Sequence, residues 1–296
     1  MSRPRERGVA LFAAVSALAV LSVVAVSLAR TTLVDQRLAG NALAALQADA
    51  LARSGVAVAA ALVGESGGAP DSLRSPWAQS AGRQPLGAGW VEVRVEDEAR
   101  RLDLTAPELA DTLPRLLAAL GLDPGLADAL ADWTDDDRVS RPRGAEREWY
   151  LGLKEPYLPA DRPLRSVGEL VRIRGFDAGS VARLRPFVTV AGEATVNPNT
   201  APREVLLAVV GDAAVADALL AARVRGPLTT EALPALVPND DTRQLLAPRA
   251  QHYLVRVVAG VGEVRRATEA TLWSPGGAEP EVVAWRAVLP GDEALR

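Results

Sequence analysis

The chain has 296 residues, a formal net charge of −4, a single histidine and no cysteine. Its length allows a membrane anchor followed by one or two domains with cores of their own. The lack of cysteine excludes disulfides and thiolate metal sites, and the single histidine excludes most zinc chemistry. The acidic balance argues against strong nonspecific binding to nucleic acid.

The first predicted element is a long helix with an apolar first half. Residues 9–29 contain no charged residue, Pro or Gly, and at about 1.5 Å per residue they would span roughly 30 Å, the thickness of a bilayer's hydrocarbon core. Three arginines in residues 1–8 precede this run, which predicts a cytoplasmic N-terminus and a single membrane pass. Residues 30–63 lack Pro and carry Leu and Ala at helical spacing, so the same helix is expected to continue outside the membrane.

The junction between leader and helix reads R-G-V-A-L at positions 7–11. A short basic leader that ends in Gly and precedes such a helix resembles the type IV pilins and the pseudopilins of type II secretion. The resemblance implies that residues 1–8 are a prepilin leader, that a prepilin peptidase cuts between Gly8 and Val9, and that Val9 becomes N-methylated. Most members carry Glu at the fifth mature position, where this chain has Ala13. The K-type minor pseudopilin is the member that lacks this Glu.

Residues 64–89 have the composition of a loop, because Gly, Ser, Pro and Gln dominate them. Residues 64–68 fit G-x-S-x-G, the pattern around the nucleophile of serine hydrolases. That pattern requires a strand before the Ser, whereas an Ala-rich helix is predicted before Ser66, so a plain loop is favoured. A membrane-anchored hydrolase remains an alternative, and it predicts that Ser66→Ala abolishes activity.

Residues 90–105 alternate between apolar and charged residues, with Val91, Val93 and Val95 on one face. This alternation, and the charged turn at residues 97–101, predict a hairpin over residues 90–104 that supplies the first strands of an antiparallel sheet.

Residues 106–249 change to helical patterns broken by Pro and Gly, which predicts an inserted helical domain. Thr105 is expected to cap its first helix, and residues 197–202 are expected to cap a later one. Residues 164–190 and 196–236 each predict a helix pair that resembles a helix-hairpin-helix unit, a module that elsewhere binds DNA backbones. Acidic residues offset the arginines in these pairs, so a compact structural domain is favoured and a nucleic-acid-binding membrane protein is the alternative.

The second helix of this domain is predicted at residues 125–133, and it leads into an acidic run at residues 132–137. Calcium takes about six to eight oxygen ligands, and carboxylates on a loop between helices can supply them. The candidate ligands are Asp132, Asp135, Asp136, Asp137, Glu146 and Glu148. Four arginines are interleaved between positions 138 and 147, and the spacing is not that of an EF-hand. Without further evidence, the residues are more typical of a solvated acidic surface.

Further residues accompany this run: P-R-G-A-E at 142–146, Tyr150, P-Y at 156–157, S-x-x-E-L at 166–170 and G-F at 175–176. Together they resemble the segment that distinguishes K-type minor pseudopilins, the general secretion pathway protein K family. The resemblance implies structural calcium, held above all by Asp135, Asp137 and Glu146. The acidic residue that the family has after Gly-Ala-Glu is replaced by Arg147 here.

The C-terminal residues 250–296 return to strand patterns, with strands expected at 251–259, 263–274 and 281–289 as an antiparallel meander. The whole pattern predicts an α+β, pilin-like fold: a long N-terminal transmembrane helix packed on an antiparallel sheet, with a large inserted all-α domain.

By resemblance, the chain would be a non-enzymatic minor pseudopilin at the tip of a type II secretion pseudopilus, which exports proteins across the outer membrane. It would start assembly with the I-type and J-type minor pseudopilins on an inner-membrane assembly platform, with most of its chain in the periplasm and no nucleic acid bound. In other members the Glu pairs with the N-terminal amine of the neighbouring subunit above. A subunit with Ala13 has no such carboxylate to neutralise, which suits the tip. A minor pilin of a type IV pilus is the nearest alternative.

Overall fold

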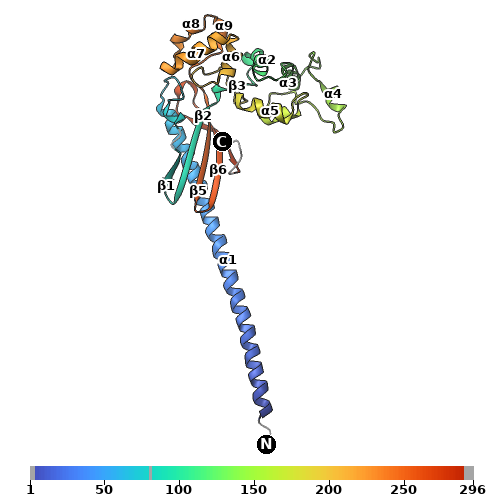
Figure 1. Cartoon of the computed structure of the whole chain (residues 1–296), viewed down its shortest axis with the longest axis vertical. Helices are drawn as coiled ribbons and strands as arrows, with labels where there is room; N and C mark the ends of the chain where they lie inside the picture. The colour runs from blue at the N-terminus through green and yellow to red at the C-terminus, as the bar shows by residue number, and fades with distance from the viewer. Residues whose placement is uncertain (1–3, 80–81, 290–296) are drawn as a thin grey trace.

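A single long helix, α1 (Pro4–Glu65), leads from the N-terminus to a sheet and a helical region in the computed structural model (Figure 1). The structure describes residues 4–79 and 82–289, with side chains from residue 11 onward. No Pro follows Pro4 within this helix, so nothing interrupts its hydrogen bonds, and the prediction of one continuous helix is confirmed. Its segment from residue 11 is long and apolar enough to cross a membrane.

The last turns of α1 pack on an antiparallel sheet. Its strands, in spatial order, are β1 (Arg83–Leu86), β2 (Gly89–Asp97), β5 (His252–Val261), β6 (Val264–Trp273) and β7 (Glu281–Val288). The predicted C-terminal meander is therefore confirmed. Small residues bring the helix close to the sheet: a side chain at Gly55 would collide with Val257.

One core lies between α1 and the sheet. On α1 its members recur every three or four residues: Ala52, Val56, Ala59 and Val63. On β5 they alternate, as the sequence predicts: Tyr253, Val255, Val257 and Ala259. Burial of each of the larger aliphatic side chains contributes roughly 1.5–3 kcal/mol, so this face alone can hold the helix on the sheet.

The opposite face of the sheet carries a chain of ion pairs instead. Arg101 pairs with Glu96 on β2, and the Nη1 atom of Arg256 on β5 lies 3.5 Å from the same carboxylate. Arg256 Nε donates to Glu269 on β6 at 3.0 Å, and Arg286 on β7 pairs with Glu269 as well. The two faces explain the alternation of apolar and charged residues in these strands.

The helical region lies between β2 and β5 in the chain and at the end of the sheet remote from the N-terminus (Figure 1). Its helices are α2 (Leu113–Ala119), α3 (Leu126–Thr134), α4 (Arg147–Leu151), α5 (Ala178–Leu184), α6 (Arg203–Val210), α7 (Ala213–Arg225), α8 (Leu233–Leu236) and α9 (Asp240–Gln244). A parallel pair of short strands joins its start to its middle: β3 (Leu102–Asp103) precedes α2, and β4 (Val188–Thr189) lies between α5 and α6. A second core of Leu, Val, Ala and aromatic side chains fills it.

Two expectations about the strands are wrong. Residues 83–86, expected in a loop, form β1 and pair with β2 across a turn at Gly87, whose φ is 56°. All four β1 residues are exposed and one is Pro85, which an edge strand tolerates but which hides the strand in the sequence. The hairpin over residues 90–104 does not form, because Leu102 turns into the helical core and pairs with Val188.

Two expected helix caps are also wrong. Thr105 donates to the Oδ1 atom of Asp103 at 2.6 Å, and the 3₁₀ turn that follows begins at Pro107 without a side-chain cap. Residues 197–202 precede α6, but Asn197 and Thr200 donate to Asp97 instead of capping that helix. At Thr105 a local hydrogen bond to Asp103 replaces the cap, whereas at residues 197–202 long-range hydrogen bonds to Asp97 do so.

A buried polar cluster fixes the helical region on the sheet. Asp97, at the end of β2, accepts hydrogen bonds from Asn197 Nδ2 and Thr200 Oγ1, each at 2.8 Å. Asp71, beside it, accepts from the hydroxyl of Tyr253 at 2.6 Å and from Trp77 Nε1 at 3.0 Å. Burial raises the pKa of Asp97 to about 7 despite these donors, and burial also raises the pKa of Asp71.

Both cores begin after residue 47, since the first α1 residue that packs into either is Leu51 and the first buried residue is Ala48. Residues 31–296 therefore keep every described core contact, and we expect them to fold without the membrane segment.

Candidate metal centre

The loop between α3 and α4 carries the acidic run. Helix α3 ends at Thr134, and Asp135 takes up an extended backbone conformation there. Asp137 then holds a tight turn, because its Oδ1 atom accepts from the backbone N–H of Val139 at 2.7 Å. Glu146 immediately precedes α4, yet its side chain makes no capping hydrogen bond. The three carboxylates are thus free to face one another.

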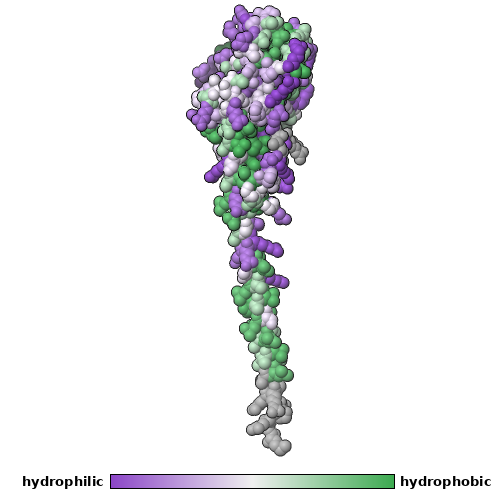
Figure 2. Space-filling model, turned by 90° about the vertical axis from the view of Figure 1, so that its left-hand side faces the viewer, coloured by the Kyte–Doolittle hydropathy of each residue, from purple (hydrophilic) through white to green (hydrophobic). Residues whose placement is uncertain are grey.

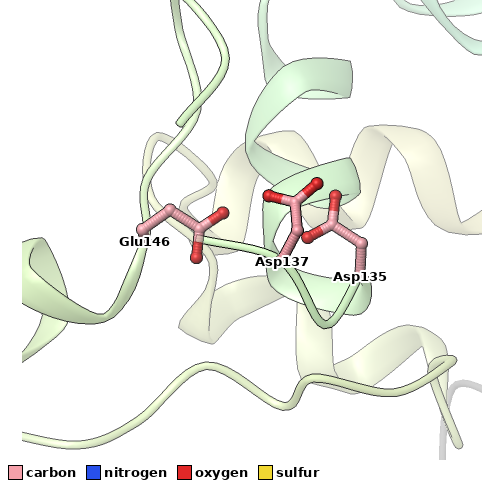
Figure 3. Close-up of side chains that lie close together, drawn as sticks. All are labelled: Asp135, Asp137 and Glu146. Atoms are coloured by element: carbon pink, nitrogen blue, oxygen red, sulfur yellow. The ribbon is translucent and has the colours of Figure 1, made fainter. Parts of the chain in front are cut away.

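Asp135, Asp137 and Glu146 converge: each offers an oxygen, and these oxygens lie within 4.8 Å of one another. Figure 3 shows Asp135 and Asp137 on the stretch after α3 and Glu146 approaching them from the strand of chain before α4. Glu146 is 5% exposed, and its Oε1 atom is buried without a hydrogen-bond partner, as is the Oδ1 atom of Asp135. Burying an acceptor without a donor is costly, and coordination of a cation by these oxygens would remove that cost.

The electrostatics of Glu146 agree with this geometry. Burial raises the pKa of Glu146, and the negative charges of Asp132, Asp135 and Asp137 raise it further. A divalent cation would offset this repulsion. The donor set is all oxygen, which fits calcium, and three carboxylates would leave further positions to water or to remaining carboxylate oxygens.

The other three candidate ligands lie outside this group of converging oxygens. Asp132 is fully buried and accepts from the backbone N–H of Arg141 at 3.1 Å and from its Nη1 atom at 2.7 Å. Gly144 leaves the space for this carboxylate, since a side chain there would collide with it. Asp136 and Glu148 are exposed.

One arginine of the four reaches the cluster. Arg141 Nη1 donates to Oδ2 of Asp135 at 2.6 Å as well as to Asp132. Arg143 instead pairs with Asp123 at 2.6 Å, and Arg138 and Arg147 are exposed. The sequence places all four among the acidic residues and does not indicate which one turns inward.

A cluster of aromatic side chains packs between the segments that flank the loop. The ring centroids of Trp133 and Tyr150 lie 5.2 Å apart, and those of Tyr150 and Tyr157 lie 5.4 Å apart. Tyr150 follows Glu146 by one helical turn and is fully buried, which raises the pKa of its hydroxyl to about 12. The guanidinium of Arg172 lies 5.1 Å from the Tyr157 ring. This packing fixes the positions of α3 and α4, and with them the spacing of the carboxylates.

Comparison with known proteins places the loop inside a recognised segment. The family model described as type II secretion system (T2SS), protein K matches residues 96–193. The type II secretion system protein K of Klebsiella pneumoniae is 30% identical over 92% of this chain and 94% of its own length. The chain belongs to the type II secretion system protein K family.

A further relative and a solved structure are also similar to this chain. The protein K of Pseudomonas aeruginosa is 33% identical over 70% of this chain and 69% of its own length. In the crystal structure of the GspK–GspI–GspJ complex from enterotoxigenic Escherichia coli, one chain matches with a TM-score of 0.66 and 22% identity, covering 83% of this chain and 97% of that one. This likeness shows the fold. The K-type resemblance and the predicted α+β fold with a pilin-like N-terminal helix are confirmed.

The remaining predicted positions lie in or next to α1. The helix covers Gly8 and Val9, the expected cleavage junction, whose side chains are outside the described part, and Ala13 lies exposed in its apolar segment. Ser66 follows directly on this helix, so the strand that a nucleophile elbow requires is replaced by a helix. This context disfavours the hydrolase alternative.

Proposed function

We propose that this chain is a minor pseudopilin that sits at the tip of a type II secretion pseudopilus and starts its assembly with I-type and J-type minor pseudopilins. Support comes from a solved structure with the same fold, which is a complex of GspK, GspI and GspJ. The observation that carries the proposal is an apolar stretch of α1 that no described part of the chain covers. Its exposed aliphatic residues are Leu33, Val34, Leu38, Leu43 and Leu46.

This stretch lies between the membrane segment and the sheet. Figure 2 shows nearly continuous apolar surface on the lowest coloured part of α1 and a mixture of polar and apolar surface between that part and the sheet, whereas the surface of the helical region is mostly polar. Apolar surface in water costs about 25 cal/mol per Å², so these exposed aliphatic side chains favour burial against partners. The long helices of two other pseudopilins are partners of matching shape and chemistry, because they would pack alongside α1 by ridges into grooves.

Two features support a place at the tip. The helical region extends beyond the sheet at the end remote from the N-terminus (Figure 1), where it would obstruct a subunit stacked above. Ala13 carries no charge, so the helix can remain in the bilayer or the filament without an amine from a neighbour above it.

The membrane segment implies the route of assembly. Apolar residues from Val9 to Ala29 would span the inner membrane once, with the arginines of the leader holding the N-terminus in the cytoplasm. A prepilin peptidase would then remove residues 1–8, and the mature chain, with a net charge of −6, would be lifted from the membrane by the assembly platform.

We also propose that calcium occupies the Asp135–Asp137–Glu146 cluster and stabilises the helical region. The ion would hold together the end of α3, the loop and the start of α4. Support comes from the converging carboxylates and from the two buried oxygens that lack donors.

The assembly proposal is tested with residues 31–296 mixed with the soluble I-type and J-type domains of the same organism. Light scattering during size exclusion, with and without calcium, is expected to give a complex of all three chains. Leu43 and Leu46 are 57% and 68% exposed, so Leu43→Glu with Leu46→Glu is expected to weaken this complex at least about tenfold without unfolding the chain.

The matched control is Val224→Glu, since Val224 is 67% exposed on α7, away from α1. It is expected to leave the complex intact. Elution of the wild-type chain alone in both conditions would contradict the proposed partners. A complex unaffected by the double substitution would support the proposed partners but exclude this stretch of α1 as their contact surface.

A further inference from the structure

We infer that Arg141 is an internal counter-ion that competes with the bound cation at the Asp135–Asp137–Glu146 cluster and lowers the affinity of the site. This inference rests on the calcium site proposed above and assigns it a regulating residue. The same side chain would keep the loop ordered when no cation is bound.

The guanidinium of Arg141 bridges two carboxylates. Arg141 Nη1 lies 2.7 Å from Oδ1 of Asp132 and 2.6 Å from Oδ2 of Asp135. Asp132 is fully buried, so its charge requires a partner within the protein. Asp135 belongs both to this ion pair and to the converging cluster. The carboxylate of Asp135 is therefore shared between Arg141 and the proposed calcium site.

The negative charge of the cluster exceeds the positive charge that Arg141 supplies. Oε1 of Glu146 is buried and accepts no hydrogen bond, and Glu146 is 5% exposed. Asp132 and the cluster together hold four carboxylates against one guanidinium. A divalent cation would bind the unpartnered oxygens. The positive charge of Arg141 would repel this cation, and its ion pair with Asp135 would occupy one of the cation's ligands.

Binding of the ion would change the partners of Arg141. When calcium takes Asp135, the guanidinium loses one of its two carboxylates and keeps Asp132. The backbone N–H of Arg141 also donates to Asp132, at 3.1 Å, so the loop stays attached to α3 in either case. The exchange is thus confined to one side chain, which is 40% exposed.

The test is calorimetric titration of calcium chloride into the full chain in detergent and into residues 31–296. Arg141→Met keeps the length of the side chain and the backbone donor but removes the charge. It is expected to raise the affinity for calcium about tenfold. Arg141→Lys keeps the charge and is expected to stay close to the wild type. Arg143→Met is the matched control, because Arg143 lies in the same loop and pairs with Asp123 instead.

A second readout is the unfolding temperature in a chelator. Arg141→Met leaves Asp132 buried without its partner, so the chelated variant is expected to melt below the wild type, and calcium is expected to raise its melting temperature by more than it raises that of the wild type. If Arg141→Met does not fold in chelator, Arg141→Met with Asp132→Asn removes the unpaired buried charge, and the titration is repeated on it.

The outcomes separate this inference from the calcium proposal. Calcium binding by the wild type with an unchanged affinity in folded Arg141→Met overturns the role of Arg141 only. An equal gain in Arg143→Met overturns it too, since any lost arginine would then have the same effect. No binding by the wild type but binding by Arg141→Met supports the competition and contradicts calcium as a resident ion. No binding by either chain overturns both.

Discussion

At the scale of single residues, burial and hydrogen-bond partners separate the candidate ligands. Glu146 and Glu148 are two positions apart, yet Glu146 is buried with an unpartnered oxygen and Glu148 is exposed. The difference arises because α4 begins between them, so that Glu146 remains on the loop that turns toward α3. The sequence identifies both as acidic and gives neither one priority by position alone.

These two residues form a matched pair for testing the calcium site. Glu146→Gln removes a charged ligand and is expected to weaken calcium binding more than about tenfold and to abolish the rise in melting temperature that calcium produces in residues 31–296. Glu148→Gln is expected to leave both unchanged. Equal effects of the two substitutions would mean that calcium responds to the general acidity of the loop.

At the scale of elements, the contact between the helical region and the sheet depends on a few buried polar groups. Asp97 ends β2, and its partners Asn197 and Thr200 come from the segment before α6. Asp71 comes from the segment after α1 and bonds with Tyr253 of β5. Segments far apart in the chain thus meet at two carboxylates, and α1, the sheet and the helices are held in one arrangement.

This contact makes stability depend on pH. The pKa of Asp97 is about 7 in the folded chain against an ordinary value of 3.8, so between about pH 4 and pH 7 the folded chain holds a proton that the unfolded chain has lost. The free energy of unfolding is therefore expected to fall as pH rises through this window, by at most about 1.4 kcal/mol per pH unit from this group, and to level off above pH 7. The raised pKa of Asp71 acts in the same direction.

Urea unfolding of residues 31–296 at several pH values tests this dependence. Asp97→Asn is expected to reduce the slope between pH 4 and pH 7, because the amide does not titrate. Asp111→Asn, at an exposed position, is expected to keep the wild-type slope. An identical slope in wild type and Asp97→Asn would show that other groups cause the dependence.

At the scale of the whole molecule, one helix connects a segment that is long and apolar enough to cross a membrane to a head that contains both cores. The apolar segment of α1 is exposed along its described length, and its first buried residue is Ala48. The described residues of this apolar segment take no part in either core, so the proposed membrane anchor and the folded head use different parts of the chain. This division also leaves the stretch between them free for partners.

The proposed orientation has a direct test, since the natural chain has no cysteine. Ser54→Cys places one thiol on the exposed side of α1 next to the sheet, and Ser2→Cys places one in the leader. A maleimide that cannot cross membranes is expected to label Ser54→Cys in spheroplasts and to label Ser2→Cys only after lysis, in cells without prepilin peptidase. The reverse pattern would contradict a cytoplasmic N-terminus.

The sequence by itself determined the features that depend on local patterns. A long run without Pro and with helical spacing produced α1, and alternation produced β5, β6 and β7, because helix and strand periods are properties of neighbouring residues. The acidic run likewise pointed to the segment that contains the converging carboxylates.

The tertiary structure decided which distant partners these segments found. Arg83–Leu86 became a strand because β2 offered it a free edge, and Leu102 left the sheet because the helical core could bury it. Arg141 turned inward because buried Asp132 required a counter-charge, whereas Arg143 found Asp123 at the surface. Such choices depend on burial and on charges brought together by folding, and no local pattern of residues records them.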